Sequence, residues 1–307
     1  MRIAAGIVLF NPEINDRFLT CLHSVLDQFD RVYMFDNSTE QYKMIDLPQN
    51  TKYITERQNK GIAYALNRIM EAADNDGYEW VVTMDQDSIL PEGTVEEYSM
   101  SIDEDGIGII CLQAIDSRRV YQVPKTEPTY EYTDRCITSG SCTSIKVWKE
   151  IGCFDEWLFI DLVDTEFSKR VIASGYKIKR INTIVMNQQF GVIEPKGKLA
   201  QRFWLEIAKL TNNINFAKFT YKKYVNPLRV YYTNRNIIYV NKKMHNYGTC
   251  GYPCYNCSSY FGFWIAFNLP SIIRAQDKKA VLKAILNGRQ EGKEKNVEPW
   301  RAKNAYM

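Results

Sequence analysis

Apolar segments of strand length alternate with amphipathic segments of helical length through the first 110 residues, and this order restricts the possible folds more than any single motif. Strands are expected at 2–10, 30–38, 51–57 and 78–88, with one helix around the apolar residues of 18–29 and another at 61–77. Such an alternation is typical of an α/β protein with a mostly parallel central sheet. In sheets of this kind, ligands bind where the strands end at their carboxyl edge.

Polar side chains lie at the ends of three of these expected strands. Asn11 follows Phe10 at the end of the first strand, and Asp36 lies at the end of the second. Asp85 and Asp87 lie at the end of the fourth, in the segment VVTMDQDSIL. Aspartate is disfavoured inside a strand, and two carboxylates one residue apart repel each other unless a cation lies between them. The three strand ends therefore predict one crevice with a polar lining.

The D-x-D pair of Asp85 and Asp87 has two interpretations. Mg²⁺ and Mn²⁺ prefer oxygen ligands and often take only one or two carboxylates while a substrate diphosphate completes the coordination shell. The carboxylates of an isolated D-x-D can instead cap the following turn or helix. The α/β context and the other polar strand ends favour the metal site.

A second acidic cluster, made of Asp161, Asp164 and Glu166, lies among apolar residues in LFIDLVDTEF. Carboxylates with apolar neighbours tend to have raised pKa values and can act as general bases. The same residues also suit the start of a helix, with Asp164 as the N-cap and further acids favoured by the helix dipole. The spacing leaves both interpretations open. The helix is expected from about 164 to 174 and is ended by Gly175.

The pattern becomes helical and basic after about residue 195. Although the formal net charge of the 307 residues is only +3, the segment 196–243 has eleven Lys and Arg against one acid, Glu206. This asymmetry predicts an anionic partner, such as phosphate, a membrane surface or nucleic acid.

Residues 259–273, SYFGFWIAFNLPSII, are aromatic and nearly uncharged. The run is shorter than the ~20 apolar residues that span a bilayer. It predicts either a helix buried in the domain or an interfacial helix that lies on a membrane, with Arg274, Lys278 and Lys279 at the headgroups.

The N-terminus and the cysteines both favour a cytoplasmic protein. Asn11, Pro12 and Glu13 stop the first apolar run earlier than a signal peptide would allow. Eight cysteines without regular pairing fit reduced thiols. Three of them cluster in CGYPCYNC but lack a fourth ligand for zinc, which favours chance clustering in a loop: Cys250, Cys254 and Cys257.

Several of these segments together resemble glycosyltransferase family 2. The nucleotide-sugar half of that family is similar to GIVLFNP at 6–12, FDNS at 35–38, NKGIAYALNRIM at 59–70 and MDQDS at 84–88. The acceptor half is similar to residues 139–176. The DQDS form, FIDLVDTEF and YYTNRN (231–236) most resemble bacterial rhamnosyltransferases of the family. The resemblance covers about residues 2–190.

The resemblance implies a GT-A fold, an inverting mechanism, a nucleoside-diphosphate sugar donor and Mg²⁺ or Mn²⁺. It implies a glycosyltransferase domain at 1–195, with the nucleotide-sugar half at about 1–105 and the acceptor half at about 106–195, followed by a basic, aromatic, helical region at 196–307. The donor-binding residues that it implies are Phe10, Asn11, Asp36, Asn59, Gly61, Asn67, Asp85 and Arg235. It also implies Asp85 and Asp87 as metal ligands, Asp164 as the catalytic base, and Asp161, Glu166 and Trp157 as acceptor-side candidates. Many relatives have a histidine-glycine pair where this chain has NQQFG at 187–191, with Gln188 or Gln189 near the expected place.

The expected reaction is transfer of L-rhamnose from dTDP-rhamnose to a hydroxyl of a growing, lipid-linked surface polysaccharide. A UDP-hexose or UDP-galactofuranose donor stays open. The expected location is the cytoplasm, with peripheral contact at the inner face of the membrane through 259–279 and no nucleic-acid partner.

Two rival functions fit the sequence less well. A nucleotidyltransferase would need a Gly-rich, basic phosphate loop after the first strand, which LFNPEIND lacks. A polyanion-binding module would use the basic segment 196–243, but it leaves the acidic clusters without a role.

Overall fold

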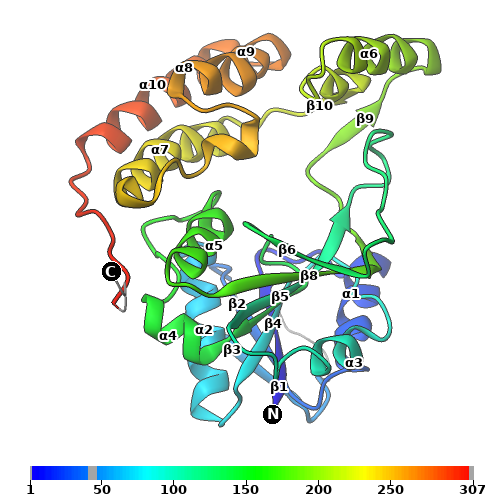
Figure 1. The fold of residues 1–307 in the computed structure, drawn as a ribbon, viewed down its shortest axis with the longest axis vertical. Helices are drawn as coiled ribbons and strands as arrows, with labels where there is room; N and C mark the ends of the chain where they lie inside the picture. The colour runs from blue at the N-terminus through cyan, green and yellow to red at the C-terminus, as the bar shows by residue number, and fades with distance from the viewer. Residues whose placement is uncertain (1, 41–46, 304–307) are drawn as a thin grey trace. The chain divides into compact units, whose positions relative to one another are not determined.

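The computed structural model describes residues 2–40 and 47–303 (Figure 1). The chain divides into two compact units. Unit 1 comprises Met1–Ala114, Pro124–Gln188 and Arg301–Met307, and unit 2 comprises Ile115–Val123 and Gln189–Trp300.

The described residues of unit 1 form an eight-stranded sheet with the order β3-β2-β1-β4-β7-β5-β8-β6. The strands are β1 (Ile3–Leu9), β2 (Val32–Asp36), β3 (Thr51–Thr55), β4 (Trp80–Asp85), β5 (Ile107–Ile115), β6 (Tyr130–Thr133), β7 (Ser141–Ser144) and β8 (Lys177–Asn187). The helices are α1 (Asp16–Leu26), α2 (Ile62–Asn75), α3 (Thr94–Ser99), α4 (Ile145–Ile151) and α5 (Val163–Ala173).

The four strands expected from the sequence form the parallel part of this sheet. Strands β3, β2, β1 and β4 pair in parallel, whereas β7 runs antiparallel to β4 and β5, and β6 runs antiparallel to β8. The α/β fold and the helices expected around 18–29, at 61–77 and at about 164–174 are therefore confirmed as α1, α2 and α5.

Close packing of α2 on β1 positions the edge of the sheet where ligands are expected. β1 has the sequence IAAGIVL and is buried along nearly its whole length, as in central strands covered on both faces. A Cβ at Gly6 would lie 2.2 Å from Cγ2 of Ile69, so only glycine allows this approach. The start of α2 lies beside the carboxyl end of β2, where Asn37 donates a hydrogen bond of 3.1 Å to the Gly61 carbonyl.

Unit 2 is mainly helical. It contains a two-stranded antiparallel sheet of β9 (Ile193–Pro195) and β10 (Tyr221–Lys223). Its helices are α6 (Lys198–Leu210), η1 (Ala217–Thr220), α7 (Pro227–Lys243), η2 (His245–Tyr247), η3 (Tyr252–Tyr255), α8 (Tyr260–Phe263), η4 (Trp264–Asn268), α9 (Leu269–Arg274) and α10 (Lys278–Glu294).

Two glycines of α10 bring it against α7. A Cβ at Gly288 would lie 2.3 Å from the carbonyl oxygen of Tyr231, and a Cβ at Gly292 would lie 2.4 Å from that of Arg235. The backbones can approach this closely only because both residues lack a side chain. The segment 258–274 adds a buried amide pair to this core, in which Asn234 and Asn268 exchange hydrogen bonds of 2.8 and 2.9 Å.

The segment 259–273 has both of the characters that were expected as alternatives. Phe263 and Asn268 are fully buried, whereas Phe261 and Ile273 expose 73% and 63% of their surface. One face of α8–α9 is therefore core, and the other is an exposed apolar surface. Within residues 2–40 and 47–303, no helix combines the length and the apolar character needed to cross a bilayer.

Candidate functional site

The parallel register places the polar strand ends on one edge of unit 1. Leu9 pairs with Asp36, and Val8 pairs with Asp85, so the residues that follow β1 lie between the two aspartates. Carboxyl ends of neighbouring parallel strands form the ligand crevice of such sheets. The structure therefore brings together the donor-side residues that follow β1, β2 and β4.

Asp85 is held on several sides at the end of β4. Its backbone N–H donates to Ser139 Oγ at 3.1 Å, and Gln188 Nε2 donates to its Oδ2 at 2.9 Å. Its carbonyl accepts a bond from the Ser88 N–H at 3.2 Å, which closes a turn. Asp87, inside this turn, is exposed. One carboxylate of the pair is thus fixed, and the other is accessible.

Gln86 ties the D-x-D turn to the end of β1. The N–H of Phe10 donates to Gln86 Oε1 at 2.8 Å, and Gln86 Nε2 donates to the Phe10 carbonyl at 3.1 Å. Asn11 then adopts a positive φ of 44°, and its N–H donates to Ser38 Oγ at 2.7 Å. Phe10 and Asn11 therefore form an ordered bridge between the ends of β4 and β2.

Asp36 is completely buried, and both of its carboxylate oxygens are used inside the protein. Oδ1 accepts a bond of 2.9 Å from the Ser38 N–H, and Oδ2 accepts one from the Tyr53 hydroxyl. Asp36 therefore shapes the end of β2 and does not present a free carboxylate to a ligand.

An asparagine that the sequence analysis missed connects β2 to α2. Asn37 Nδ2 donates to Asn59 Oδ1 and to the Gly61 carbonyl, both at 3.1 Å, and its Oδ1 accepts a bond of 3.0 Å from the Lys60 N–H. The signal that could have identified it is its position directly after Asp36, at a strand end.

Gly61 brings the start of α2 against the loop that precedes α5. Its φ is +91°, and a Cβ would lie 2.6 Å from the Phe159 carbonyl oxygen. That carbonyl accepts a bond of 2.8 Å from the Ile62 N–H. Asn59 and Gly61 are thus placed where the donor-side and acceptor-side segments of unit 1 meet.

Asn67 is buried beneath the same loop, where its amide makes four hydrogen bonds. It accepts from the Trp148 indole N–H at 3.1 Å and the Phe154 N–H at 2.9 Å, and donates to the Phe154 carbonyl at 3.0 Å and to Glu156 Oε1 at 2.8 Å. Asn67 therefore holds the loop in place. Trp157 follows in this loop, half-buried, with its N–H bonded to Asp155 Oδ1 at 3.0 Å.

The backbone is strained directly before α5. Asp161 and Leu162 have φ values of 68° and 63°, which non-glycine residues rarely adopt. Each such residue costs on the order of 1–3 kcal/mol, and consecutive strained residues cluster at functional sites. This strain could not be predicted from the sequence, because neither residue is a glycine.

Asp164 lies in the first turn of α5, and the N-cap is Leu162. The alternative in which Asp164 itself is the N-cap is therefore wrong. Its Oδ1 accepts a bond of 2.7 Å from the Thr165 N–H. Burial raises the pKa of Asp164, and the nearby carboxylate of Asp161 raises it further, while the hydrogen bonds from Thr165 lower it. A raised pKa brings a carboxylate closer to the range of an effective general base.

The segment from Cys136 to Ser139 joins the two acidic clusters. Ser139 binds the backbone of Asp85, and the Cys136 N–H donates to Ser168 Oγ at 3.3 Å. Ser168 lies one helical turn after Asp164, on the same side of α5. Four residues span at most about 14 Å. The end of β4 and this side of α5 therefore adjoin the same short segment.

Glu166 is fully buried and paired with Arg170. The guanidinium donates to Glu166 Oε1 and Oε2 at 2.6 and 2.7 Å, and to the carbonyls of Ile151 and Cys153 at 2.8 and 2.6 Å. Glu166 was expected on the acceptor side. Its burial corrects this expectation, because it anchors α5 to the end of α4 and cannot face an acceptor.

We expect Glu166→Ala to lower the free energy of unfolding by about 3–5 kcal/mol, because the substitution leaves the buried Arg170 charge without its partner. Chemical denaturation followed by circular dichroism measures this loss. The exposed Glu92 provides the control, since Glu92→Ala should change stability by less than about 0.5 kcal/mol. Equal stability of the two variants would contradict the anchoring role.

Arg235 belongs to α7 in unit 2 and reaches α10 through Glu291. Its Nε donates to Asn236 Oδ1 at 2.9 Å, its NH1 lies 3.3 Å from Glu291 Oε1, and its guanidinium lies over the Tyr232 ring. These contacts hold its side chain within the helical core of unit 2.

The donor set at the end of β4 fits a hard divalent cation. Among the described residues, no group of three or more His, Cys, Asp or Glu could hold a metal by itself. Mg²⁺ and Mn²⁺ do not require such a group when a diphosphate supplies further oxygens. In addition, Gln188 is 93% buried beside Asp85, and its Oε1 has no hydrogen-bond partner in the part of the chain that the structure describes. An uncharged amide oxygen of this kind suits a hard cation.

Comparison with known protein families agrees with this arrangement. Residues 6–143 match the model of glycosyl transferase family 2. Over 208 residues, which are 62% of this chain and 69% of the relative, the sequence is 29% identical to the dTDP-rhamnosyl transferase RfbF of Shigella flexneri.

Two solved structures share the fold at low sequence identity. The mannosyltransferase PcManGT from Pyrobaculum calidifontis, in complex with GDP-Man and Mn²⁺, is 12% identical with a TM-score of 0.53 over 96% of this chain and 76% of that chain. GalNAc-T7 with UDP, GalNAc and Mn²⁺ is 11% identical with a TM-score of 0.51 over 62% of this chain and 44% of that chain. The chain thus spans less than half of GalNAc-T7. These likenesses concern the fold and confirm the expected GT-A type.

Proposed function

We propose that this chain, which belongs to glycosyl transferase family 2 through residues 6–143, transfers L-rhamnose from dTDP-rhamnose to a hydroxyl of a surface glycan. Glycosyl transfer itself follows from the family. The observation that favours rhamnose is the 29% identity to a dTDP-rhamnosyl transferase. The family also decides against the two rivals, a nucleotidyltransferase and a polyanion-binding module.

The donor is proposed to bind across the carboxyl ends of β1, β2 and β4. Phe10 and Asn11 would border the nucleotide, with Asn59 and Gly61 beside it at the start of α2. Asp36 and Asn67 would support these segments without contacting the donor, because both side chains are buried and hydrogen-bonded within the protein. We assign no donor contact to Arg235, because its guanidinium is engaged in unit 2.

A divalent cation, Mg²⁺ or Mn²⁺, would be held by Asp85 and Asp87 with Gln188 Oε1 beside them. When bound, it neutralises charge on the departing diphosphate. The protein's part is to orient these ligands: Ser139 and Gln188 fix Asp85, and Gln86 anchors the turn to Phe10.

Asp164 is proposed to remove the proton of the acceptor hydroxyl. Its raised pKa and its position in the first turn of α5 support this role. The hydroxyl then attacks the anomeric carbon from the face opposite the diphosphate, so the configuration inverts. Asp161 and Trp157, on the strained loop before α5, would border the acceptor.

The acceptor is proposed to be lipid-linked. The exposed apolar side of 259–279 supports contact with a membrane, since an interfacial helix needs an apolar face with cations beside it. A lipid-linked acceptor would be presented at that surface.

Donor choice is tested by calorimetric titration with dTDP-rhamnose, UDP-glucose and UDP-galactofuranose in the presence of Mn²⁺. We expect dTDP-rhamnose to bind at least about tenfold more tightly, because a few hydroxyl and methyl contacts are worth about 1–3 kcal/mol. Tighter binding of either UDP donor would overturn the rhamnose assignment and retain the family activity.

A further inference from the structure

Helix α6 carries an apolar stripe on its solvent side. None of its residues is buried within the described part of the chain. Leu199, Phe203 and Leu210 expose 83%, 58% and 82% of their surface. Steps of four and seven residues place all three on one face of the helix. A soluble protein seldom exposes large apolar side chains in a row unless they serve an interaction.

Other contacts attach α6 to the rest of unit 2, so the stripe is not needed for packing. Trp204 stacks on Phe219 with ring centroids 4.8 Å apart. The guanidinium of Arg274 lies over the Phe219 ring, 4.5 Å from its centroid. Arg274 NH2 also donates to the Lys218 carbonyl at 3.5 Å. These contacts join α6 to the end of α9.

Positive charge accompanies the stripe. Lys198, Arg202 and Lys209 are exposed on α6. The only acid of this helix, Glu206, lies three residues after Phe203 and four before Leu210, and so on the face of the stripe. The excess of Lys and Arg continues to residue 243. Long basic side chains can keep their charges at an anionic surface while apolar neighbours enter it. The charge is therefore complementary to the headgroups of acidic lipids.

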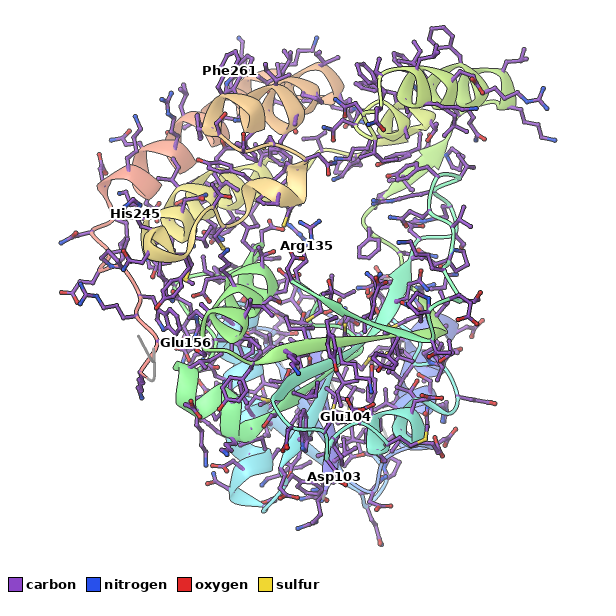
Figure 2. The ribbon with its side chains drawn as sticks, viewed as in Figure 1. Asp103, Glu104, Arg135, Glu156, His245 and Phe261 are labelled. Atoms are coloured by element: carbon purple, nitrogen blue, oxygen red, sulfur yellow. The ribbon has the colours of Figure 1, made fainter. Side chains whose placement is uncertain are left out.

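A second exposed apolar face adjoins α6 within unit 2. Phe261, Ile265 and Ile273 of the helix 260–274 expose 73%, 48% and 63% of their surface. Figure 1 shows α6 and α9 along the same edge of unit 2, and Figure 2 shows Phe261 on the outer side of α8. Arg274 contacts the η1 segment that packs on α6. The helix 260–274 and α6 are therefore linked through η1 within unit 2.

We propose that α6 is an interfacial helix that binds anionic lipid bilayers, with Leu199, Phe203 and Leu210 in the acyl boundary and its cations at the headgroups. This inference extends the membrane contact beyond 259–279 and does not depend on the sugar that is transferred. A second copy of the chain is the other candidate occupant. Lipid is favoured, because pairing two stripes would bring like charges together.

Binding is tested by co-sedimentation of the full chain with vesicles of phosphatidylcholine alone or mixed with phosphatidylglycerol. The mixed vesicles should bind the chain at least about tenfold more strongly, since each cation near an anionic surface raises the binding constant by about fivefold. Salt should weaken this binding, because the screening length falls from about 10 Å at 0.1 M to about 3 Å at 1 M.

Two variants separate the apolar and the ionic contributions. Leu199→Ser combined with Leu210→Ser should lower binding to mixed vesicles by about tenfold or more, since each leucine loses its transfer into the acyl boundary. Arg202→Gln combined with Lys209→Gln should lower binding to the mixed vesicles and leave binding to phosphatidylcholine vesicles unchanged. Met100→Ser is the matched control, because Met100 is 67% exposed in unit 1 and should not affect binding. Circular dichroism should show the same helix content in all variants.

Two results would overturn the proposal. One is vesicle binding by the leucine variant equal to that of the wild type. The other is a wild-type dimer in sedimentation that this variant converts to monomer while vesicle binding stays unchanged. The vesicles contain no glycan acceptor, so neither result bears on the proposed sugar transfer.

Discussion

Replacing Asp164 by asparagine is expected to lower the rate constant of sugar transfer by about 10²- to 10⁴-fold, the usual scale for loss of a general base. The substitution keeps the shape of the side chain and removes its ability to accept the proton. Donor affinity should stay near the wild-type value, because the donor contacts proposed here lie at the ends of β1, β2 and β4. Steady-state kinetics and donor titration together measure this separation.

The pH dependence of the transfer rate tests the role of Asp164 independently. Since burial raises the pKa of Asp164, the wild-type rate should fall on the acid side at a pH above the ordinary range of an aspartate. This acid limb should be absent from Asp164→Asn. A raised carboxyl pKa also means that the folded state loses stability as pH rises from the ordinary pKa of an aspartate to the raised pKa of Asp164. The variant should therefore be at least as stable as the wild type at neutral pH, so that lost activity is not lost folding.

Asp161→Asn is the comparison that decides the base. Asp161 lies three residues earlier, on the strained turn, and its carboxylate contributes to the raised pKa of Asp164. A modest loss of rate is expected. If Asp161→Asn had no transfer activity while Asp164→Asn were nearly as active as the wild type, the catalytic base would be Asp161.

Asp87→Ala is expected to weaken Mn²⁺-dependent donor binding by about 10²- to 10³-fold, since a bound cation contributes several kcal/mol of charge neutralisation at a diphosphate. Asp87 is exposed and lies in a turn closed by Asp85 and Ser88, so the fold should be retained. Calorimetry with dTDP-rhamnose in Mn²⁺ or in chelator measures the effect.

The controls for this prediction use the same titration. Chelator should weaken wild-type binding about as much as the substitution does, and it should have little further effect on the variant. The exposed Glu92→Ala should behave as the wild type. Wild-type binding that is unchanged in excess chelator would contradict the metal role of Asp85 and Asp87.

The parallel half of the sheet could be predicted from the sequence because its signals are local. β1 is an unbroken apolar run, and β4 is an apolar segment that stops at Asp85, so both the strand and its end are visible in a few residues. Parallel pairing then aligns the ends without further information. The edge that carries Asn11, Asp36 and Asp85 follows from these facts.

The partners of the site residues could not be predicted, because they come from distant parts of the chain. Gln188 reaches Asp85 from the end of β8, and Ser139 reaches it from the segment before β7. The left-handed conformation of Leu162 also has no sequence signal, because tertiary packing imposes it on a residue that disfavours it. The Glu166–Arg170 spacing suits an ion pair on a helix, but its complete burial depends on α4.

Metal-dependent, inverting transfer of rhamnose is tested by mixing the protein, Mn²⁺ and dTDP-rhamnose and measuring both the release of dTDP and the configuration of the sugar product by NMR. Water can serve as the acceptor when no glycan is supplied. We expect release of dTDP that stops in chelator and a first-formed sugar whose anomeric configuration is inverted relative to the donor. A product with retained configuration, or release that continues in chelator at the full rate, would contradict it.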